Sequence, residues 1–125
     1  MPFVDGFVIA VPHANKEQFV AHARHFDEML MAEGALRVVE CWGVDVQPGQ
    51  HTDFRRAVDA REDEAVCFSW VEWPDRATRD AAHARFAEKM ASGEWAETAG
   101  SQPDMPFDGK RLVFGGFEPV LVLDR

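Results

Sequence analysis

Two segments of the chain carry apolar residues at the spacing of an amphipathic helix. In the segment from Asn15 to Gly34 these residues recur at intervals of four, three and four: Phe19, Ala23, Phe26 and Leu30. That spacing places them on one face of a helix. We expect Asn15 to cap the N-terminus and Gly34 to end the helix in the left-handed conformation. A second helix is expected from Asp75 to about Ala91.

Four other segments are rich in apolar, β-branched and aromatic residues, which is typical of strands. They cover residues 3–11, 35–46, 64–73 and 110–123. The elements therefore follow one another in the order β-α-β-β-α-β. This order predicts an α+β fold of the ferredoxin-like type, in which an antiparallel sheet carries two helices on one face. We expect residues 1–125 to form a single ferredoxin-like domain.

The predicted strands are apolar on both faces of the sheet. A sheet with one face in water alternates apolar and polar residues. In residues 64–73, however, Phe68 and Trp70 lie in one phase, and Cys67 and Val71 in the other. Two helices cover only one face, so a second copy of the chain is expected to cover the other. The sequence thus predicts a homodimer whose sheets pack face to face around an enclosed space, a dimeric α/β barrel.

Charge and composition exclude several classes of partner. The chain has 13 Lys and Arg against 22 Asp and Glu, a net charge of −9. Such a surface repels phosphate backbones and anionic lipids, so neither nucleic acid nor membrane is expected as a partner. The N-terminal residues lack the features of an export signal, which predicts a cytoplasmic protein. Cys41 and Cys67 have no metal-binding spacing, and we expect no metal and no cofactor.

Five strings of residues resemble one known family. They are VDGFVIAVP, GALRVVECWG, TDFRRAV, FSWVEWP and MPFDGKRLVFGGFE. Together they closely resemble the YbaA-like family, small bacterial proteins of unknown function, in the same order over nearly the whole chain. The resemblance implies a ferredoxin-like fold and a dimeric α/β barrel. It implies no activity and no catalytic residues.

Acidic residues inside the predicted strands are the first catalytic candidates. If the second and third strands pair with residues of equal parity on one face, Glu40, Trp42, Trp70 and Glu72 share the face toward the dimer space. Burial there would raise the pKa of both glutamates, which suits a general acid or base. The two tryptophans would shape an apolar pocket. The alternative is that both glutamates form ion pairs with arginine or lysine.

The long connection between the second and third strands holds further candidates. Long loops in compact domains are often functional. Asp45, Asp53 and Arg55 are predicted to bind a ligand, with Arg55 contacting a substrate carboxylate or phosphate. His51 is the predicted titrating residue of this loop. Lys110 is expected to close one end of the cavity. The alternatives are that Asp53 caps a short helix and that Arg55 pairs with surface acids.

Three classes of function remain open at this point. The first is a small-molecule enzyme whose chemistry, by analogy with the fold, is cofactor-independent oxygenation or isomerisation of a small anionic or aromatic metabolite. The second is a noncatalytic homodimer that binds a small ligand, such as a stress-associated protein. The third is an assembly module with a filled interface. The sequence carries no phosphate-binding loop, nucleophile elbow or zinc-protease motif that would decide among them.

Overall fold

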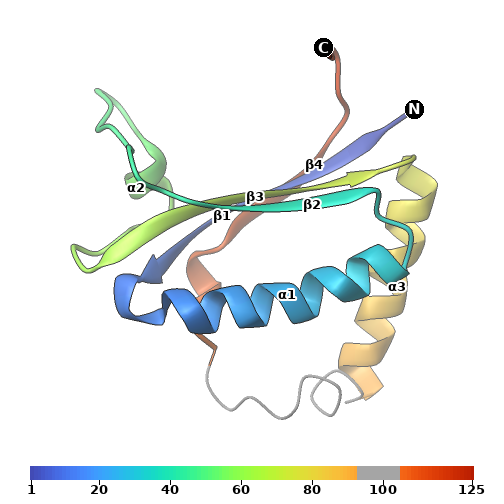
Figure 1. Ribbon diagram of the computed structural model, residues 1–125, viewed down its shortest axis with the longest axis horizontal. Coiled ribbons are helices and arrows are strands. Elements are labelled where there is room, and N and C mark those ends of the chain that lie inside the picture. The colour runs from blue at the N-terminus through green and yellow to red at the C-terminus, as the bar shows by residue number, and fades with distance from the viewer. Residues whose placement is uncertain (93–104) are drawn as a thin grey trace.

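The computed structural model describes residues 1–92 and 105–125 and shows a four-stranded antiparallel sheet with the strand order β2-β3-β1-β4 (Figure 1). Two long helices lie on one face of this sheet. The elements are β1 (Phe3–Pro12), η1 (His13–Asn15), α1 (Lys16–Ala32), β2 (Arg37–Trp42), α2 (Phe54–Ala57), β3 (Glu64–Trp73), α3 (Arg76–Ser92), η2 (Gly109–Arg111) and β4 (Val113–Phe117). The predicted ferredoxin-like fold is confirmed. No helix in the described residues is long and apolar enough to cross a membrane.

Both ends of α1 lie where the sequence predicts them, but the N-terminal residue does not cap the helix with its side chain. Gly34 has a φ of +113°, which a side chain would strain, so glycine ends the helix as expected. Asn15 occupies the N-cap position as predicted, but its side chain bonds no backbone N–H of α1. Its amide instead donates to the Pro106 carbonyl oxygen at 3.0 Å. This bond ties the start of α1 to the segment that leads into β4.

The other two helix starts are capped by aspartates. Asp75 Oδ1 accepts a 2.7 Å hydrogen bond from the Thr78 N–H in the first turn of α3. Asp53 Oδ1 accepts a 2.8 Å bond from the Arg56 N–H in α2. Each carboxylate satisfies an N–H that has no partner inside its helix. The helix start expected at Asp75 is therefore confirmed, and so is the alternative in which Asp53 caps a short helix.

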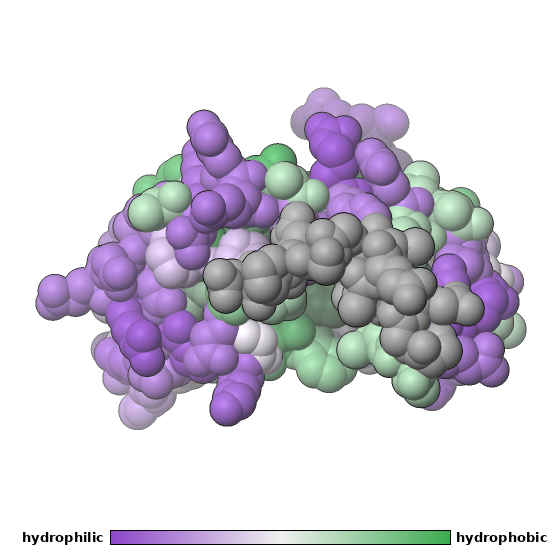
Figure 2. Space-filling model, turned by 90° about the horizontal axis from the view of Figure 1, so that it is seen from below, coloured by the Kyte–Doolittle hydropathy of each residue, from purple (hydrophilic) through white to green (hydrophobic). Residues whose placement is uncertain are grey.

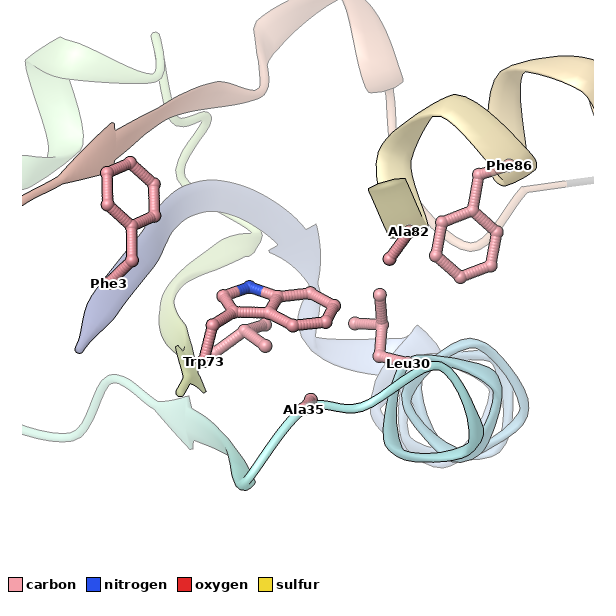
Figure 3. Close-up of a cluster of buried hydrophobic side chains, with 7 residues drawn as sticks. Phe3, Leu30, Ala35, Trp73, Ala82 and Phe86 are labelled. Atoms are coloured by element: carbon pink, nitrogen blue, oxygen red, sulfur yellow. The ribbon is translucent and has the colours of Figure 1, made fainter. Parts of the chain in front are cut away.

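The core lies between the sheet and the two long helices. Trp73 of β3 is completely buried and lies at the centre of one cluster, with Leu30 of α1 and Phe86 of α3 reaching toward it (Figure 3). A second cluster continues along the sheet and includes Ile9 and Phe19. These apolar contacts stabilise the fold because they remove large side chains from water.

The register of β2 against β3 differs from the predicted one. Glu40 pairs with Ser69, and Trp42 pairs with Cys67, so residues of opposite parity share a face. Glu40 and Trp42 therefore face the helices, whereas Trp70 and Glu72 face away from them. The prediction that these four residues share one face is wrong. A shift of one residue reverses every side chain of a strand, and the long connection before β3 supplies no turn geometry that fixes the shift.

The sheet face away from α1 and α3, called the open face below, is only partly covered. At one end Val58, which follows α2, packs on Ala10 and Val66 and is 1% exposed. Elsewhere three large apolar side chains of this face are exposed: Phe68, Val113 and Phe117. The prediction that both faces of the sheet are apolar is confirmed for these strands.

Strand β4 is shorter than predicted. It ends at Phe117, and the residues after it, the C-terminal tail 118–125, are in no strand. The two mid-strand glycines pair regularly with β1, Gly115 opposite Gly6, so the strand has no bulge there. Gly116 permits a close approach instead, because a Cβ at this position would lie 2.8 Å from both Arg79 and Phe3.

Candidate functional site

A cavity of about 360 Å³ lies between α1 and the helix-side face of the sheet. Most of its described wall is apolar, with Phe7, Ile9, Phe19, Phe26, Phe107 and Leu112 among its lining residues. Figure 2 views the molecule from the helix side and shows apolar surface near the middle of this face, between hydrophilic ends. A cavity of this volume and character is typical of a small-molecule site.

Two carboxyl groups, those of Asp27 and Glu40, lie on the cavity wall. Asp27 projects from α1 and Glu40 from β2, and both line the same cavity. Asp27 lies on the cavity side of α1 because it follows Ala23 by four residues and precedes Leu30 by three. Glu40 faces α1 because it shares the phase of Val38. Glu40 is exposed and Asp27 is half-buried, so a molecule can reach both.

The surroundings of the pair raise the pKa values of both carboxyls toward neutral pH. Loss of water raises the pKa of Asp27 to about 6, against the opposing effect of its hydrogen bond with Glu40. Loss of water also raises the pKa of Glu40 to about 7, and the negative charge of Asp27 adds to that rise. The Ser69 side chain bonds to Glu40 and lowers its pKa. Between about pH 6 and 7 the pair therefore holds about one proton, as interacting acids do.

The acid pair also borders a groove on the outside of the domain. Asp27 and Glu40 line this groove, which has a volume of about 530 Å³ and runs between α1 and β2. Arg24 and Arg37 line it as well. Their guanidinium groups lie 3.8 Å from Glu28 and 3.9 Å from Glu72, respectively. The pair thus stands between an apolar cavity and a charged outer groove.

The structure separates the two glutamates that the sequence predicted as catalytic. Glu40 lies in the cavity under the helices, while Glu72 lies on the open face. There Glu72 Oε2 accepts a 2.9 Å hydrogen bond from the Trp70 indole N–H and lies 3.9 Å from Arg37. The alternative prediction, that these glutamates form ion pairs with arginine or lysine, therefore fits Glu72.

Two loop residues that were predicted to bind a ligand hold the loop together. Asp53 accepts bonds from the backbone N–H groups of Arg56 and Gly49, which lower its pKa. Arg55 donates to two carbonyl oxygens, that of Glu64 at 2.9 Å and that of Arg61 at 2.7 Å. Neither residue lines the cavity. Their ligand-binding role stays a prediction beside these structural contacts.

The remaining predicted site residues are dispersed. Asp45 and His51 are exposed in the loop before α2, and Lys110 is exposed in η2. Trp42 is half-buried on the helix side, where it packs against Phe19 with ring centroids 6.1 Å apart. None of these four predicted residues lines the cavity, although Lys110 follows Gly109, which does.

Sequence reasoning missed Asp27, and it also missed a buried acid in β1. Asp5 is 2% exposed and accepts bonds from the Trp73 indole N–H at 2.9 Å and from Arg79 at 2.9 Å. His83 Nε2 lies 3.2 Å from the same carboxylate. An acid in the buried phase of an apolar strand is the signal that marks Asp5. Across residues 1–92 and 105–125, no group of three or more His, Cys, Asp or Glu forms a metal site.

Comparison with known proteins identifies the family of this chain and its relatives, and none of them has a described activity. Residues 2–109 match the family described as "Protein of unknown function (DUF1428)". The chain is 45% identical over 121 residues to "Uncharacterized protein YbaA" of Escherichia coli K12, covering 97% of this chain and 98% of the relative. The Shigella flexneri protein of that name matches equally well. A crystal structure described as a dimeric ferredoxin-like protein, from an uncultured marine organism, aligns over 100% of both chains with 13% identity and a TM-score of 0.51.

Proposed function

Since the chain belongs to the DUF1428 family, which brings no activity with it, we propose a function from the cavity itself. The protein binds a small, largely apolar molecule between α1 and the sheet and transfers protons to and from it with the Asp27–Glu40 pair. The reaction class is isomerisation. Of the chemistries considered for this fold, isomerisation alone consists entirely of proton movements.

One observation carries this proposal: two carboxyls, Asp27 and Glu40, line a cavity whose wall is otherwise mostly apolar. A general acid or base works best when its pKa lies near the operating pH. In the singly protonated pair, the Asp27 carboxylate removes a proton from a substrate carbon. The Glu40 carboxyl then delivers its proton to a second atom of the substrate. A proton then passes from the Asp27 carboxyl to the Glu40 carboxylate, and the pair returns to its starting state.

The walls indicate the class of substrate. Aromatic side chains such as Phe19, Phe26 and Phe107 line the cavity and suit an aromatic or branched apolar body. On the far side of the acid pair, Arg24 and Arg37 line the outer groove and suit a carboxylate or phosphate. A small anionic molecule with an apolar body matches both surroundings.

We also propose that the protein is a homodimer that pairs through its open faces. The exposed Phe68, Val113 and Phe117 support this assembly, because a monomer would leave them in water. The solved structure with the same fold is itself described as dimeric. Light scattering of the purified protein at micromolar concentration is expected to give twice the chain mass. A stable monomer there would contradict the dimer.

The catalytic proposal is tested by proton exchange on a captured ligand. The protein is incubated with a bacterial metabolite extract in D₂O, and retained small molecules are identified by native mass spectrometry. We expect a retained ligand that gains deuterium at carbon with the wild type. Loss of a general acid or base costs about 10²-fold to 10⁴-fold, so Glu40→Gln and Asp27→Asn should slow the exchange by at least a hundredfold.

Glu72→Gln is the matched control, because it makes the same chemical change on the open face. Equal exchange rates in the wild type and both cavity variants would contradict the proposal. A ligand that is retained without any exchange would favour the noncatalytic binding protein instead. The mostly apolar wall is the observation that favours this second function.

A further inference from the structure

We propose that the C-terminal tail, residues 118–125, packs against the open face of a second copy of the chain. This inference rests on the proposed dimer and adds to it a specific segment that each copy gives to the other. It depends on three features of the tail: its lack of a partner strand, its exposed apolar side chains and the side of the sheet to which it points.

The tail has no strand to pair with in its own sheet. β4 runs antiparallel to β1, and Val4 pairs with Phe117. Continued by two residues, this register would place Pro119 opposite Pro2, and neither proline has an N–H to donate. β1 begins at Phe3, which this register places opposite Glu118, so the rest of the tail runs past the start of β1. The backbone groups of its last residues therefore have no partner in β1.

The middle of the tail is apolar and lies in water. Its four consecutive apolar side chains have exposed fractions of 96%, 75%, 62% and 85%: Val120, Leu121, Val122 and Leu123. An extended apolar segment with free backbone groups is the kind of strand that pairs with another chain. Single exposed apolar residues are ordinary, but four in succession indicate a surface that another molecule covers.

The direction of the tail selects the partner surface. Figure 1 shows the tail leaving the sheet on the side away from α1 and α3, which is the side of the open face. On that face Phe68 and Phe117 are 42% and 60% exposed. Eight extended residues reach roughly 26 Å, whereas four strands span only about 15 Å. The tail of one copy is thus long enough to cross the open face of the other.

The first test measures how strongly the tail contributes to the dimer. A full-length variant with serine at Val120, Leu121, Val122 and Leu123 keeps the chain length but removes the apolar side chains. Sedimentation velocity should show at least a hundredfold weaker dimer for this variant. Val44→Ser is the control, because Val44 is 93% exposed in the loop before α2. A dimer of unchanged affinity in the tail variant would overturn the inference and leave the proposed dimer intact.

The second test locates the tail on the partner. One copy carries a nitroxide label at Val122→Cys, with the exposed Cys41 replaced by serine, while Cys67 is buried and stays. This labelled copy is mixed with a second copy that carries no nitroxide and is enriched in ¹⁵N. We expect the nitroxide to broaden the indole N–H signal of Trp70, on the open face, in the enriched copy. The indole signal of Trp73, buried on the helix side, serves as the internal control and should stay sharp.

The outcomes separate the two proposals. A mixed dimer in which neither indole signal broadens would overturn the placement of the tail only. A chain that stays monomeric at micromolar concentration would overturn the dimer, and the tail inference with it. Broadening of the Trp73 signal would place the tail on the helix side and also contradict the inference.

Discussion

The indole nitrogen of Trp73 donates a 2.9 Å hydrogen bond to Oδ2 of Asp5, so a carboxylate from β1 is held inside the core by the most deeply buried aromatic ring. The guanidinium of Arg79 in α3 supplies the positive charge opposite this carboxylate, and its Nη2 donates to Asp5 Oδ1 at 2.9 Å. The contact joins β1, β3 and α3 at one point. Buried charges persist only where such partners satisfy them.

Replacing Asp5 by asparagine should destabilise the fold strongly. The change leaves the guanidinium of Arg79, whose side chain is 19% exposed, without its main counter-charge. Breaking a buried pair in this way costs about 3 kcal/mol or more in the free energy of unfolding. Urea unfolding followed by circular dichroism measures the loss. Asp80→Asn is the control, since exposed Asp80 also bonds Arg79, and a loss as large in that variant would show that burial is not the cause.

Acid should weaken the link between η2 and β3. Arg111 donates to both carboxylate oxygens of Glu64 at 2.7 Å, and these bonds lower the pKa of Glu64 to about 2. The unfolded chain, with a pKa near 4.5, then binds more protons, so stability falls as pH drops from about 4.5 to about 2. Arg111→Met should flatten this slope. A slope unchanged by Arg111→Met in unfolding experiments from pH 2 to 7 would exclude Glu64 as its source.

The raised pKa of Glu40 implies the opposite dependence on pH. The folded chain keeps the Glu40 proton up to about pH 7, while the unfolded chain loses it near 4.5. Stability therefore falls as pH rises through this window. Glu40→Gln, which never ionises, should be more stable than the wild type at pH 8 and equal to it at pH 4. Glu72→Gln should show no such gain, and an equal gain in that variant would refute this explanation.

Two neighbours of Glu40 should move its pKa in opposite directions. Ser69 pairs with Glu40 across the strands and lowers the pKa of its carboxyl, so Ser69→Ala should raise that pKa above about 7. Asp27→Asn removes a negative charge beside it, so the pKa should fall. Carbon-detected NMR titration of the side-chain carboxyl measures both shifts. Movement in the same direction in the two variants would show that Glu40 does not interact with its neighbours as described.

The elements of the fold follow from local patterns, but their pairing does not. The spacing of apolar residues in α1 and the aspartate caps at Asp53 and Asp75 are local signals, and they predicted the helices well. The parity of β2 against β3 depends on how a long loop returns the chain, which no local pattern encodes. The end of β4 also escaped prediction, because the apolar residues after Phe117 continue the strand pattern past the start of β1, where they have no strand to pair with.

The candidate site was only half predictable for a similar reason. Glu40 was identified because an acid in an apolar strand is unusual. Asp27 was missed because acids are common on helices, and only the contact with β2 distinguishes this one. The cavity was expected between two copies of the chain. An apolar strand face shows that something covers it, but not whether helices of the same chain or a second copy do so.

The packing of Val58 on Ala10 and Val66 limits how two sheets can meet. The segment around α2 rises from one end of the open face, so an approaching sheet meets this segment before it reaches the ends of β1 and β3. If two copies pair through their open faces as proposed, the two segments would stand at opposite ends and act as steric stops. The gap between the sheets is then set by the length of the loop that carries α2, so shortening or extending this loop would change the volume enclosed between the copies without altering either sheet.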